Sequence, residues 1–563
     1  MRKAILKIIS LFIAAAMLIA LIPTGLICAS AATLLSGTCG DNLMWELDGE
    51  GSLTITGTGA MTDYSHIYQN GSWITTSPWG SGIKTVTINS GVTSIGESAF
   101  YYCTGLTSVT IPESVTSIGD YAFLGCTGLT SVTICNGATD IGWYAFEGCT
   151  GLTSVPIPDG ATSIGNGAFR RCTGLTSITI PDSVTSIGDE VFANCTGLTS
   201  VTIPDGVTSI GESTFCDCTG LTSVTIGNGV ASIGKEPFTG CTGLETITVA
   251  ENNPVYHSAG NCLIETDSRT LILGCKNSVI PADGSVTSIG WCAFNACAGL
   301  TSITIPDSVT SIGNSAFNFC TGLASLAIPD SVTSIGDHAF FNTGYYNDAS
   351  NWENGVLYIG KWVIDALSNV SGAYTIKSGT VGIAGGAFRG DGLTSVTIPD
   401  GVITIGAWAF SCCADLTNVT IPDSVTSIGD YAFEECISLT SLTIPSSVTS
   451  IGECAFHCFE YYTFDYIPLD VTLRIYENSY AHRYAIDEGF VYELIATTLS
   501  KGDSDGDGRI TVSDALAALR IAAKLVEPTA DDFAVLDIDG DGKIAVNDAL
   551  AVLRVAAKLV DSL

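Results

Sequence analysis

A phenylalanine recurs every 23 residues through most of this chain, and this period constrains the fold more than any other feature. It marks fourteen units in three runs, with one 22-residue step within the last run: Phe100, Phe123, Phe146, Phe169, Phe192, Phe215 and Phe238, then Phe294, Phe317 and Phe340, then Phe388, Phe410, Phe433 and Phe456. One unit reads A-F-x-x-C-T-G-L-T-S-V-T-I-P-D-S-V-T-S-I-G, followed by two variable residues. A unit this short cannot cover its own apolar side chains, so neighbouring units must stack against one another. The sequence therefore predicts a solenoid.

Each unit carries its own local signals. Val109-Thr110-Ile111 alternates apolar and polar residues, which is typical of a short strand, and Pro112 ends it because proline has no N–H to donate. Ile118 is a second apolar anchor, and Gly119 permits a sharp turn with positive φ. Residues 120–123 are long enough for one helical turn. We expect a β-rich solenoid with short helical turns.

These residues resemble the BspA-like (Treponema-type) leucine-rich-repeat family, whose units share the pattern A-F-x-x-C…L-x-x-(V/I)-x-I-P. The resemblance covers about residues 83–480 and implies a surface-exposed or secreted binding protein with varied targets. Two units are longer than the rest, at 253–280 and 345–380. Their extra strand-like segments, such as 270–273 and 356–359, are interpreted as hairpins within the solenoid.

The N-terminus predicts export. Arg2 and Lys3 precede an apolar run over 4–22, and Ala29-Ser30-Ala31 offers a signal-peptidase site. Cys28 follows Ile27, where a lipidated cysteine would follow a small residue, so lipidation is the lesser alternative. The predicted location is extracellular. The expected division is a signal peptide (1–31), an N-terminal β cap (32–82), the solenoid (83–472), a C-terminal cap (473–499) and a separate module (500–563).

Charge and cysteine content narrow the function further. The formal net charge of −35 argues against binding to nucleic acid or an anionic membrane, and no later segment predicts a membrane span. Eleven of the 21 cysteines stand three residues after a marker phenylalanine. Equivalent side chains on parallel coils point the same way, which suits an interior ladder of free thiols better than disulfides.

Composition changes after Ser500, where two acidic loops follow one another 34 residues apart. Each has the spacing of an EF-hand calcium loop, with glycine at position 6 and aspartate at position 12. The predicted ligands for two Ca²⁺ ions are Asp503, Asp505, Asp507, Arg509 (backbone carbonyl) and Asp514, then Asp537, Asp539, Asp541, Lys543 (backbone carbonyl) and Asp548. Ala545 replaces Thr511 at position 9, so the second site is expected to be the weaker.

A helix follows each loop, predicted at 514–526 and 548–560. Apolar residues at i, i+3, i+7 and i+10 predict one face on each along which the two helices pack. The members of these faces are Leu516, Leu519, Ala523 and Val526, then Leu550, Leu553, Ala557 and Val560.

Aspartate in place of glutamate at position 12, with no helix before the loop, resembles a type I dockerin. That resemblance implies a small all-α, calcium-folded module that binds a cohesin domain of a cellulosome scaffold in either of two orientations. Carried over residue by residue, the cohesin contacts would be Val512, Ser513, Arg520, Val546, Asn547 and Arg554. On spacing alone, the two arginines are as consistent with an ordinary solvated face.

Nothing in the sequence marks a catalytic site. Gly502-Asp-Ser504-Asp-Gly506 satisfies G-x-S-x-G but lies inside a calcium loop. Binding fits better, because aromatic residues occupy the variable positions of the repeat and aromatic faces stack on sugars or anchor protein partners. The candidate ligand surface is Tyr101, Tyr102, Trp143, Tyr144, Trp291, Trp408 and Tyr431.

We therefore expect a non-catalytic accessory subunit of a cellulosome-like complex, which binds a polysaccharide, a protein or a surface ligand through the solenoid. A polysaccharide-degrading hydrolase and a cell-surface adhesin are the alternatives.

Overall fold

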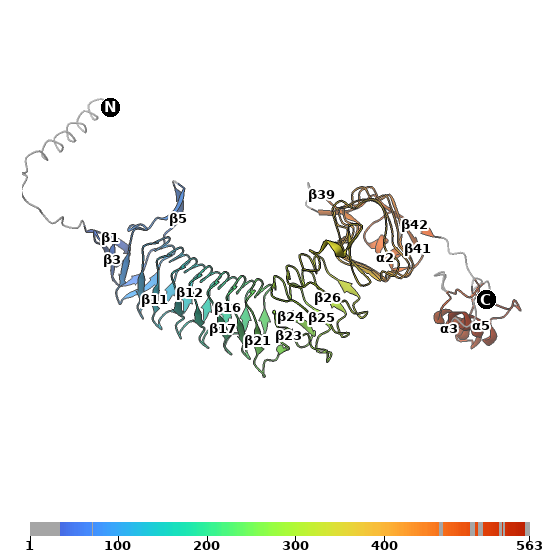
Figure 1. Cartoon of the computed structure of the whole chain (residues 1–563), viewed down its shortest axis with the longest axis horizontal. Helices are drawn as coiled ribbons and strands as arrows, with labels where there is room; N and C mark the ends of the chain where they lie inside the picture. Colours follow the sequence, from blue (N-terminus) through green and yellow to red (C-terminus); the bar gives the residue numbers. More distant parts are fainter. Residues whose placement is uncertain are drawn as a thin grey trace, which may run out of the picture.

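The computed structural model describes residues 34–69, 71–460, 465–495, 501–504, 510–528, 532 and 535–557. Most of them form one curved stack of parallel coils, which runs from the blue to the orange part of the chain in Figure 1. Equivalent residues of neighbouring coils lie 23 positions apart in the regular part of the stack. The predicted signal peptide lies outside the described residues. None of the described helices is both long enough and apolar enough to cross a membrane.

Most regular coils contribute one strand to a ladder of longer strands, and these pair in parallel. Val109 faces Val132, and Ile111 faces Ile134, so the apolar residues of successive coils stack in register. The strand predicted at residues 109–111 is confirmed. The strands are β7 (Thr85–Ile88), β9 (Ser108–Ile111), β11 (Ser131–Ile134), β13 (Ser154–Pro156), β15 (Ser177–Thr179), β17 (Ser200–Ile203), β19 (Ser223–Ile226), β21 (Thr246–Val249), β31 (Ser371–Thr375), β33 (Gly392–Thr397), β35 (Asn418–Thr420) and β37 (Ser441–Thr443).

A second ladder of short strands runs beside the first and is built on the Ser-Ile pair of the repeat. The sequence had indicated only an apolar anchor here, at Ile118, which pairs with Ile95 and Ile141. The strands are β8 (Val92–Ile95), β10 (Ser117–Ile118), β12 (Asp140–Ile141), β14 (Ser163–Ile164), β16 (Ser186–Ile187), β18 (Ser209–Ile210), β20 (Ser232–Ile233), β25 (Ser288–Ile289), β26 (Ser311–Ile312), β27 (Ser334–Ile335), β32 (Gly382–Ile383), β34 (Thr404–Ile405), β36 (Ser427–Ile428) and β38 (Ser450–Ile451).

The helical turn predicted at residues 120–123 is wrong. Tyr121 has a φ of 56° and Gly125 a φ of 70°. The backbone is therefore in the left-handed region at these two residues, which a helical turn does not allow. Every second N–H group of the turn points along the stack: Tyr121 donates to the carbonyl of Trp143 and Phe123 to that of Ala145. The turns thus form a third ladder of hydrogen bonds between coils.

Gly119 is needed for close approach rather than for a positive φ. A Cβ on Gly119 would lie 2.7 Å from the backbone nitrogen of Glu97 and 2.9 Å from the carbonyl oxygen of Ile95, both in the preceding coil. A side chain at this position would force neighbouring coils apart.

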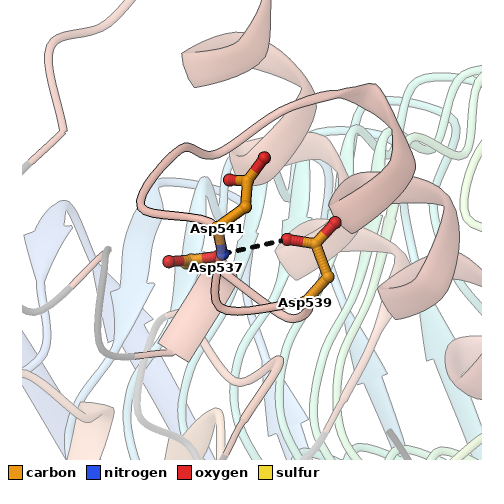
Figure 2. A group of neighbouring side chains, drawn as sticks. All are labelled: Asp537, Asp539 and Asp541. Carbon is orange, nitrogen blue, oxygen red and sulfur yellow. Dashed lines mark hydrogen bonds between the residues drawn. The ribbon is translucent and has the colours of Figure 1, made fainter.

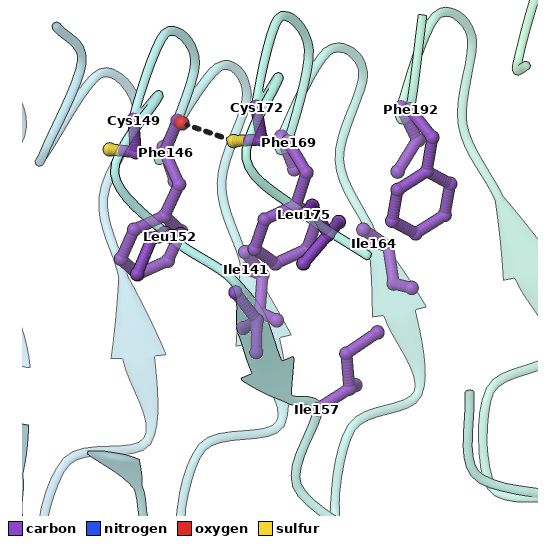
Figure 3. Packing of buried hydrophobic residues seen from close by; sticks show 14 of the residues in the cluster. Ile141, Phe146, Cys149, Leu152, Ile157, Ile164, Phe169, Cys172, Leu175 and Phe192 are labelled. Carbon is purple, nitrogen blue, oxygen red and sulfur yellow. Dashed lines mark hydrogen bonds between the residues drawn. The ribbon is translucent and has the colours of Figure 1, made fainter. Parts of the chain in front are cut away.

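The interior is a column of stacked rings flanked by aliphatic side chains (Figure 3). The rings of Phe123 and Phe146 are nearly parallel, with centroids 5.1 Å apart. Beside them, the Sγ of Cys172 donates to the carbonyl of Phe146, at 3.2 Å, and burial raises the pKa of the Cys172 thiol to about 12. The same contact recurs along the stack. Nine of the eleven ladder cysteines donate their thiol to the carbonyl of the marker phenylalanine one coil earlier, and the described cysteines form no disulfide.

Irregular elements close both ends of the stack. At the N-terminal end, β1 (Leu35–Gly40), β2 (Leu43–Leu47) and β3 (Ser52–Gly57) are antiparallel, and β3 then pairs in parallel with β7. Strand β4 (Gly59–Ala60) begins the short ladder, and β5 (His66–Gln69) with β6 (Ser72–Thr75) forms a hairpin. At the other end lie the hairpin β39 (His457–Glu460) and β40 (Asp465–Pro468), then β41 (Thr472–Tyr476), α2 (Tyr480–Asp487) and β42 (Tyr492–Ile495).

Two insertions interrupt the ladders and divide the core. The first contains β22 (Tyr256–Ala259), β23 (Cys262–Glu265) and β24 (Thr270–Leu273); the second contains η1 (Ala349–Asn351), β28 (Trp352–Glu353), β29 (Val356–Ile359) and β30 (Trp362–Ala366). In each, antiparallel strands end in one that rejoins the short ladder in parallel, so the predicted hairpins are confirmed. The apolar core accordingly falls into three clusters along the solenoid.

Candidate functional site

Two helices near the C-terminus pack against each other, each directly after an acidic loop. They are α3 (Val512–Ala522) and α5 (Val546–Ala556), and each starts two residues before its predicted bound. Helix α3 also stops earlier than predicted, since Lys524 has a φ of 58°. We refer to α3, α5 and their loops as the C-terminal helix pair.

The aspartate at position 12 of each loop is buried and organises the backbone around it. Asp514 accepts hydrogen bonds from the N–H groups of Ser504 and Thr511, each at 2.7 Å. Asp548 accepts from Ile538 and Ala545, at 2.8 and 2.9 Å. These partners are equivalent positions 34 residues apart, so the two loops share one design that ties loop to helix.

In the second loop, three carboxylates converge (Figure 2). Ligand oxygens of Asp537, Asp539 and Asp541 all lie within 4.8 Å of one another. The backbone N–H of Asp541 donates to both Asp537 and Asp539, at 3.0 and 3.2 Å, and that of Gly542 donates to Asp537 at 2.9 Å. Within the described chain, no Lys or Arg side chain forms a salt bridge with these carboxylates. Their mutual repulsion is offset by backbone N–H dipoles and by the side-chain amide of Asn547, which donates to Asp539.

Other predicted ligands are placed less completely. Asp503 is buried like Asp514, whereas Asp505, Asp507 and Arg509 lie outside the described residues. The backbone N–H of Lys543, at position 7, donates to the carboxylate of Asp541 at 2.8 Å, so the backbone here turns around the acidic side chains. Thr511 caps α3 through its side chain, and Ala545 has no side chain with which to do the same for α5.

The predicted packing face of the two helices is wrong. Its leucines are exposed: 48% for Leu516, 45% for Leu519, 46% for Leu550 and 37% for Leu553. Buried instead are Ala515, Ala518, Ile521, Ala549 and Val552, which pack with Val535, Leu536 and Ile544.

Asp514 supplies a signal that could have found the buried face. Because the position-12 carboxylate points into the loop, residues four and seven positions later, Ala518 and Ile521, must face inward as well. Small alanines also let the helices approach closely. The leucines then remain on the outer surface.

The residues predicted from the dockerin resemblance lie on this outer surface. Val512 and Val546 are 62% and 65% exposed and stand one helical turn before Leu516 and Leu550. Also exposed are Ser513, Asn547, Arg520 and Arg554. Sequence reasoning missed the leucines as surface residues because it assigned them to the core.

The structure places the seven aromatic residues of the candidate ligand surface in three separate groups. Tyr101 is buried and stacks on His66 of the β5–β6 hairpin, next to the exposed Tyr102. Nearby, Tyr144 stacks on Tyr121, beside the exposed Trp143.

Trp291 lies apart from these residues, at the first insertion, and is 46% exposed. Trp408 and Tyr431 stack on each other toward the C-terminal end, with ring centroids 5.5 Å apart, and Tyr431 also contacts Tyr466 of the β39–β40 hairpin. The structure therefore does not gather the seven residues into one patch.

A family model for the BspA type leucine rich repeat region matches residues 80–175, 139–259, 272–381 and 381–486, well over half of the chain. The chain belongs to the BspA-type leucine-rich-repeat family. No curated protein matches the sequence of this chain.

Several solved structures are similar to this BspA-type protein. A leucine rich cell surface protein from Faecalibacterium prausnitzii is 28% identical, with 68% of this chain covering 94% of that one at a TM-score of 0.39. The leucine rich repeat protein of T. pallidum is 27% identical, with coverage of 39% and 91% and a TM-score of 0.29. The pneumococcal vaccine antigen PcpA is 16% identical, with coverage of 83% and 99% and a TM-score of 0.38.

The family match ends at residue 486, before the C-terminal helix pair. The repeat family therefore accounts for the solenoid, and the helix pair is additional to it. Within that pair, the hydroxyl of Ser504, the central residue of the G-x-S-x-G motif, donates to Asp514 at 2.9 Å. It contributes to loop structure.

Proposed function

We propose that this BspA-type protein is a secreted, non-catalytic binding subunit, which docks onto a larger complex through a calcium-dependent C-terminal module. The observation that carries the proposal is the duplicated geometry of the helix pair. Two loops with equivalent hydrogen bonds to a buried aspartate present two equivalent helices, whose valines and leucines are exposed. A pair of matched apolar faces on so small a module supports a docking role.

The donor set of the loops fits calcium. Asp537, Asp539 and Asp541 offer hard oxygen ligands in one place, and Asp548 closes the loop behind them. Asp503, Asp505, Asp507 and Asp514 would serve the first ion, with backbone carbonyls of Arg509 and Lys543 completing position 7. Bound Ca²⁺ supplies the positive charge that offsets repulsion among the carboxylates, and thereby couples folding of the module to the ion.

The exposed faces support a cohesin domain as the docking partner, in line with the resemblance to type I dockerins. Val512, Leu516 and Leu519 form one apolar strip, and Arg520 stands next to it. Val546, Leu550, Leu553 and Arg554 repeat the arrangement. Ser513 and Asn547 add polar contacts at the start of each helix. Because the strips are equivalent, either one can meet the same partner surface.

The solenoid is the ligand-binding part, and its target is a polysaccharide, another protein or a surface ligand. Its edge carries the aromatic groups described above, and the predicted export signal supports a location outside the cell. A leucine-rich surface protein is among the similar structures. An adhesin would use the same solenoid, but it would leave the helix pair without a purpose, so the docking subunit is favoured.

Calorimetric titration of the full chain with calcium tests the first part. We expect two ions per chain, the weaker at the loop with Ala545, and Asp539→Asn should remove one of them. Asp182→Asn, on a solenoid turn, is the control and should leave both. A chain that binds no calcium would refute the proposal.

Binding to a panel of cohesin domains, with and without chelator, tests the second part. Leu519→Glu or Leu553→Glu alone should leave calcium-dependent binding through the unaltered helix. The double variant should abolish it while still binding two calcium ions. A double variant that binds as the wild type does would show that these faces are not the docking surface.

A further inference from the structure

The hydrogen-bond ladder of the turns is broken at the first insertion. In the preceding coil, the N–H of Ser213 donates to Lys235 and that of Phe215 to Pro237. The equivalent N–H groups one coil later, on Glu236, Phe238 and Gly240, find no acceptor among the described residues. The inserted chain intervenes, and Gly274 takes the carbonyl of Ala293 instead. Of these three residues, Glu236 and Phe238 line the gap between the two coils.

A cavity of about 210 Å³ occupies this gap. The Nζ of Lys235 lies 5.7 Å from the ring centroid of Trp291, and the thiol of Cys292 donates to the carboxylate of Glu236 at 3.1 Å. The cavity therefore offers an aromatic face, hydrogen-bond donors and a carboxylate acceptor. Its volume is below the roughly 300–1,000 Å³ of sites for drug-sized ligands, so it holds one small unit.

Trp291 also forms the end of a longer groove of about 380 Å³ along the short-strand ladder. The groove crosses coils from Ser288 to Ser427, and the coils before and after the second insertion are joined where the N–H of Gly385 donates to the carbonyl of Ile335 at 2.9 Å. Its polar lining consists of hydroxyl and amide side chains, and adjacent hydroxyls are linked, as between Ser311 and Ser288 at 2.8 Å. No charged residue lines it, although the chain has 77 of them.

We infer that the cavity and groove together bind a neutral glycan chain, with one sugar ring held at Trp291 and further rings along the hydroxyl-lined groove. A sugar combines an apolar face, which stacks on an aromatic ring, with many hydroxyls that both donate and accept hydrogen bonds. The cavity supplies the ring, the free N–H donors and the Glu236 acceptor. The uncharged groove gives a nucleic acid or a charged peptide nothing to pair with. This inference rests on the proposed role of the solenoid as the binding part.

Phe319 is the control for Trp291. It is an aromatic residue that is 47% exposed and lines neither the cavity nor the groove, and its coil has an intact ladder, in which its own N–H donates to Phe341 at 2.9 Å. Ser334 in the groove is likewise matched by Ser209, at the same repeat position outside it. The full chain, loaded with calcium, would be titrated calorimetrically with the hexasaccharides of cellulose, xylan and mannan, and with hexagalacturonate as the anionic probe.

We expect at least one neutral hexasaccharide to bind and hexagalacturonate to bind more weakly. Trp291→Ala should weaken binding about tenfold or more, through the lost stacking face, and Phe319→Ala should leave it unchanged. Ser334→Asp should weaken binding while Ser209→Asp does not. Equal effects of either matched pair, or preference for the anionic probe, would overturn the inference. A chain that passes the calcium and cohesin tests but binds no neutral hexasaccharide would overturn it and leave the docking proposal intact.

Discussion

Asp391 occupies the place of a ladder cysteine, three residues after Phe388, and this substitution should make the solenoid sensitive to pH. Its side chain is 3% exposed, and its Oδ2 has no hydrogen-bond partner. Burial, with a smaller contribution from the negative charge of Asp365, raises the pKa of Asp391 to about 7 from an ordinary 3.8. This carboxyl is therefore about half ionised at neutral pH, and at higher pH the charged carboxylate is buried and poorly solvated.

The sign and size of the effect follow from the raised pKa. Between about pH 4 and pH 7, the native carboxyl keeps a proton that the unfolded chain releases, so stability falls as pH rises through this window and then levels off. The difference between a pKa of about 7 in the native chain and 3.8 in the unfolded chain corresponds to about 4 kcal/mol of stability, since each pH unit is worth about 1.4 kcal/mol. Some access of water to the carboxyl would reduce this, and we expect about 2–4 kcal/mol above pH 7.

Asp391→Cys should recover that free energy, because a thiol here stays neutral: burial raises the pKa of neighbouring Cys413 to about 12. Urea unfolding at pH 4.5, 6 and 8, with calcium saturating, would be compared between variant and wild type. The stability difference should grow from pH 4.5 to pH 8.

Thr343→Cys is the control. Thr343 holds the same ladder position and donates to the carbonyl of Phe340 at 3.0 Å, without a titratable group. Its stability difference from wild type should not vary with pH. Parallel pH profiles for Asp391→Cys and wild type would refute the reasoning.

Other predictions follow from the coil geometry. Gly119→Ala should destabilise the solenoid by more than 2 kcal/mol, roughly the cost of overpacking, whereas Gly82→Ala, with nothing within 4 Å of its Cβ, should be nearly neutral in thermal unfolding. Cys172→Ala should cost about 1–3 kcal/mol, because the Phe146 carbonyl loses one of its two donors, keeping only the N–H of Cys149, and a small void remains. In the native chain a maleimide should label exposed Cys412 and leave Cys172 unlabelled; rapid labelling of Cys172 would contradict a closed thiol ladder.

The solenoid was predictable from sequence because every unit has the same pattern of apolar and polar residues. Val109 and Ile111 alternate with polar residues, and repetition in 23-residue register leaves parallel stacking as the way to bury them. The turn between coils was not predictable on the same grounds. Its N–H groups bond to the next coil, so Tyr121 adopts a left-handed conformation that local propensity does not favour.

The C-terminal helix pair shows a second limit of prediction from sequence, which concerns the face of a helix that is buried. The periodic leucines on α3 and α5 indicated an apolar face correctly, but periodicity does not say whether such a face meets the core or another molecule. Asp514 decides it, because a carboxylate committed to the loop fixes which side of the helix is inside. The acidic loops themselves were readable from spacing alone. Their convergence at Asp537, Asp539 and Asp541 is a matter of backbone turns that the glycine permits.

A regular solenoid leaves little to bind with, because each coil satisfies the polar groups of the next. Between Phe192 and Phe238, carbonyls, N–H groups and ring faces are paired from coil to coil. Recognition therefore needs interruptions. At Glu236 the ladder stops and its donors face a cavity, and at Trp291 the exposed ring joins that cavity to an uncharged groove. The insertions are the parts of the sequence that depart from the repeat, and they create unsatisfied groups in a fold that otherwise has few.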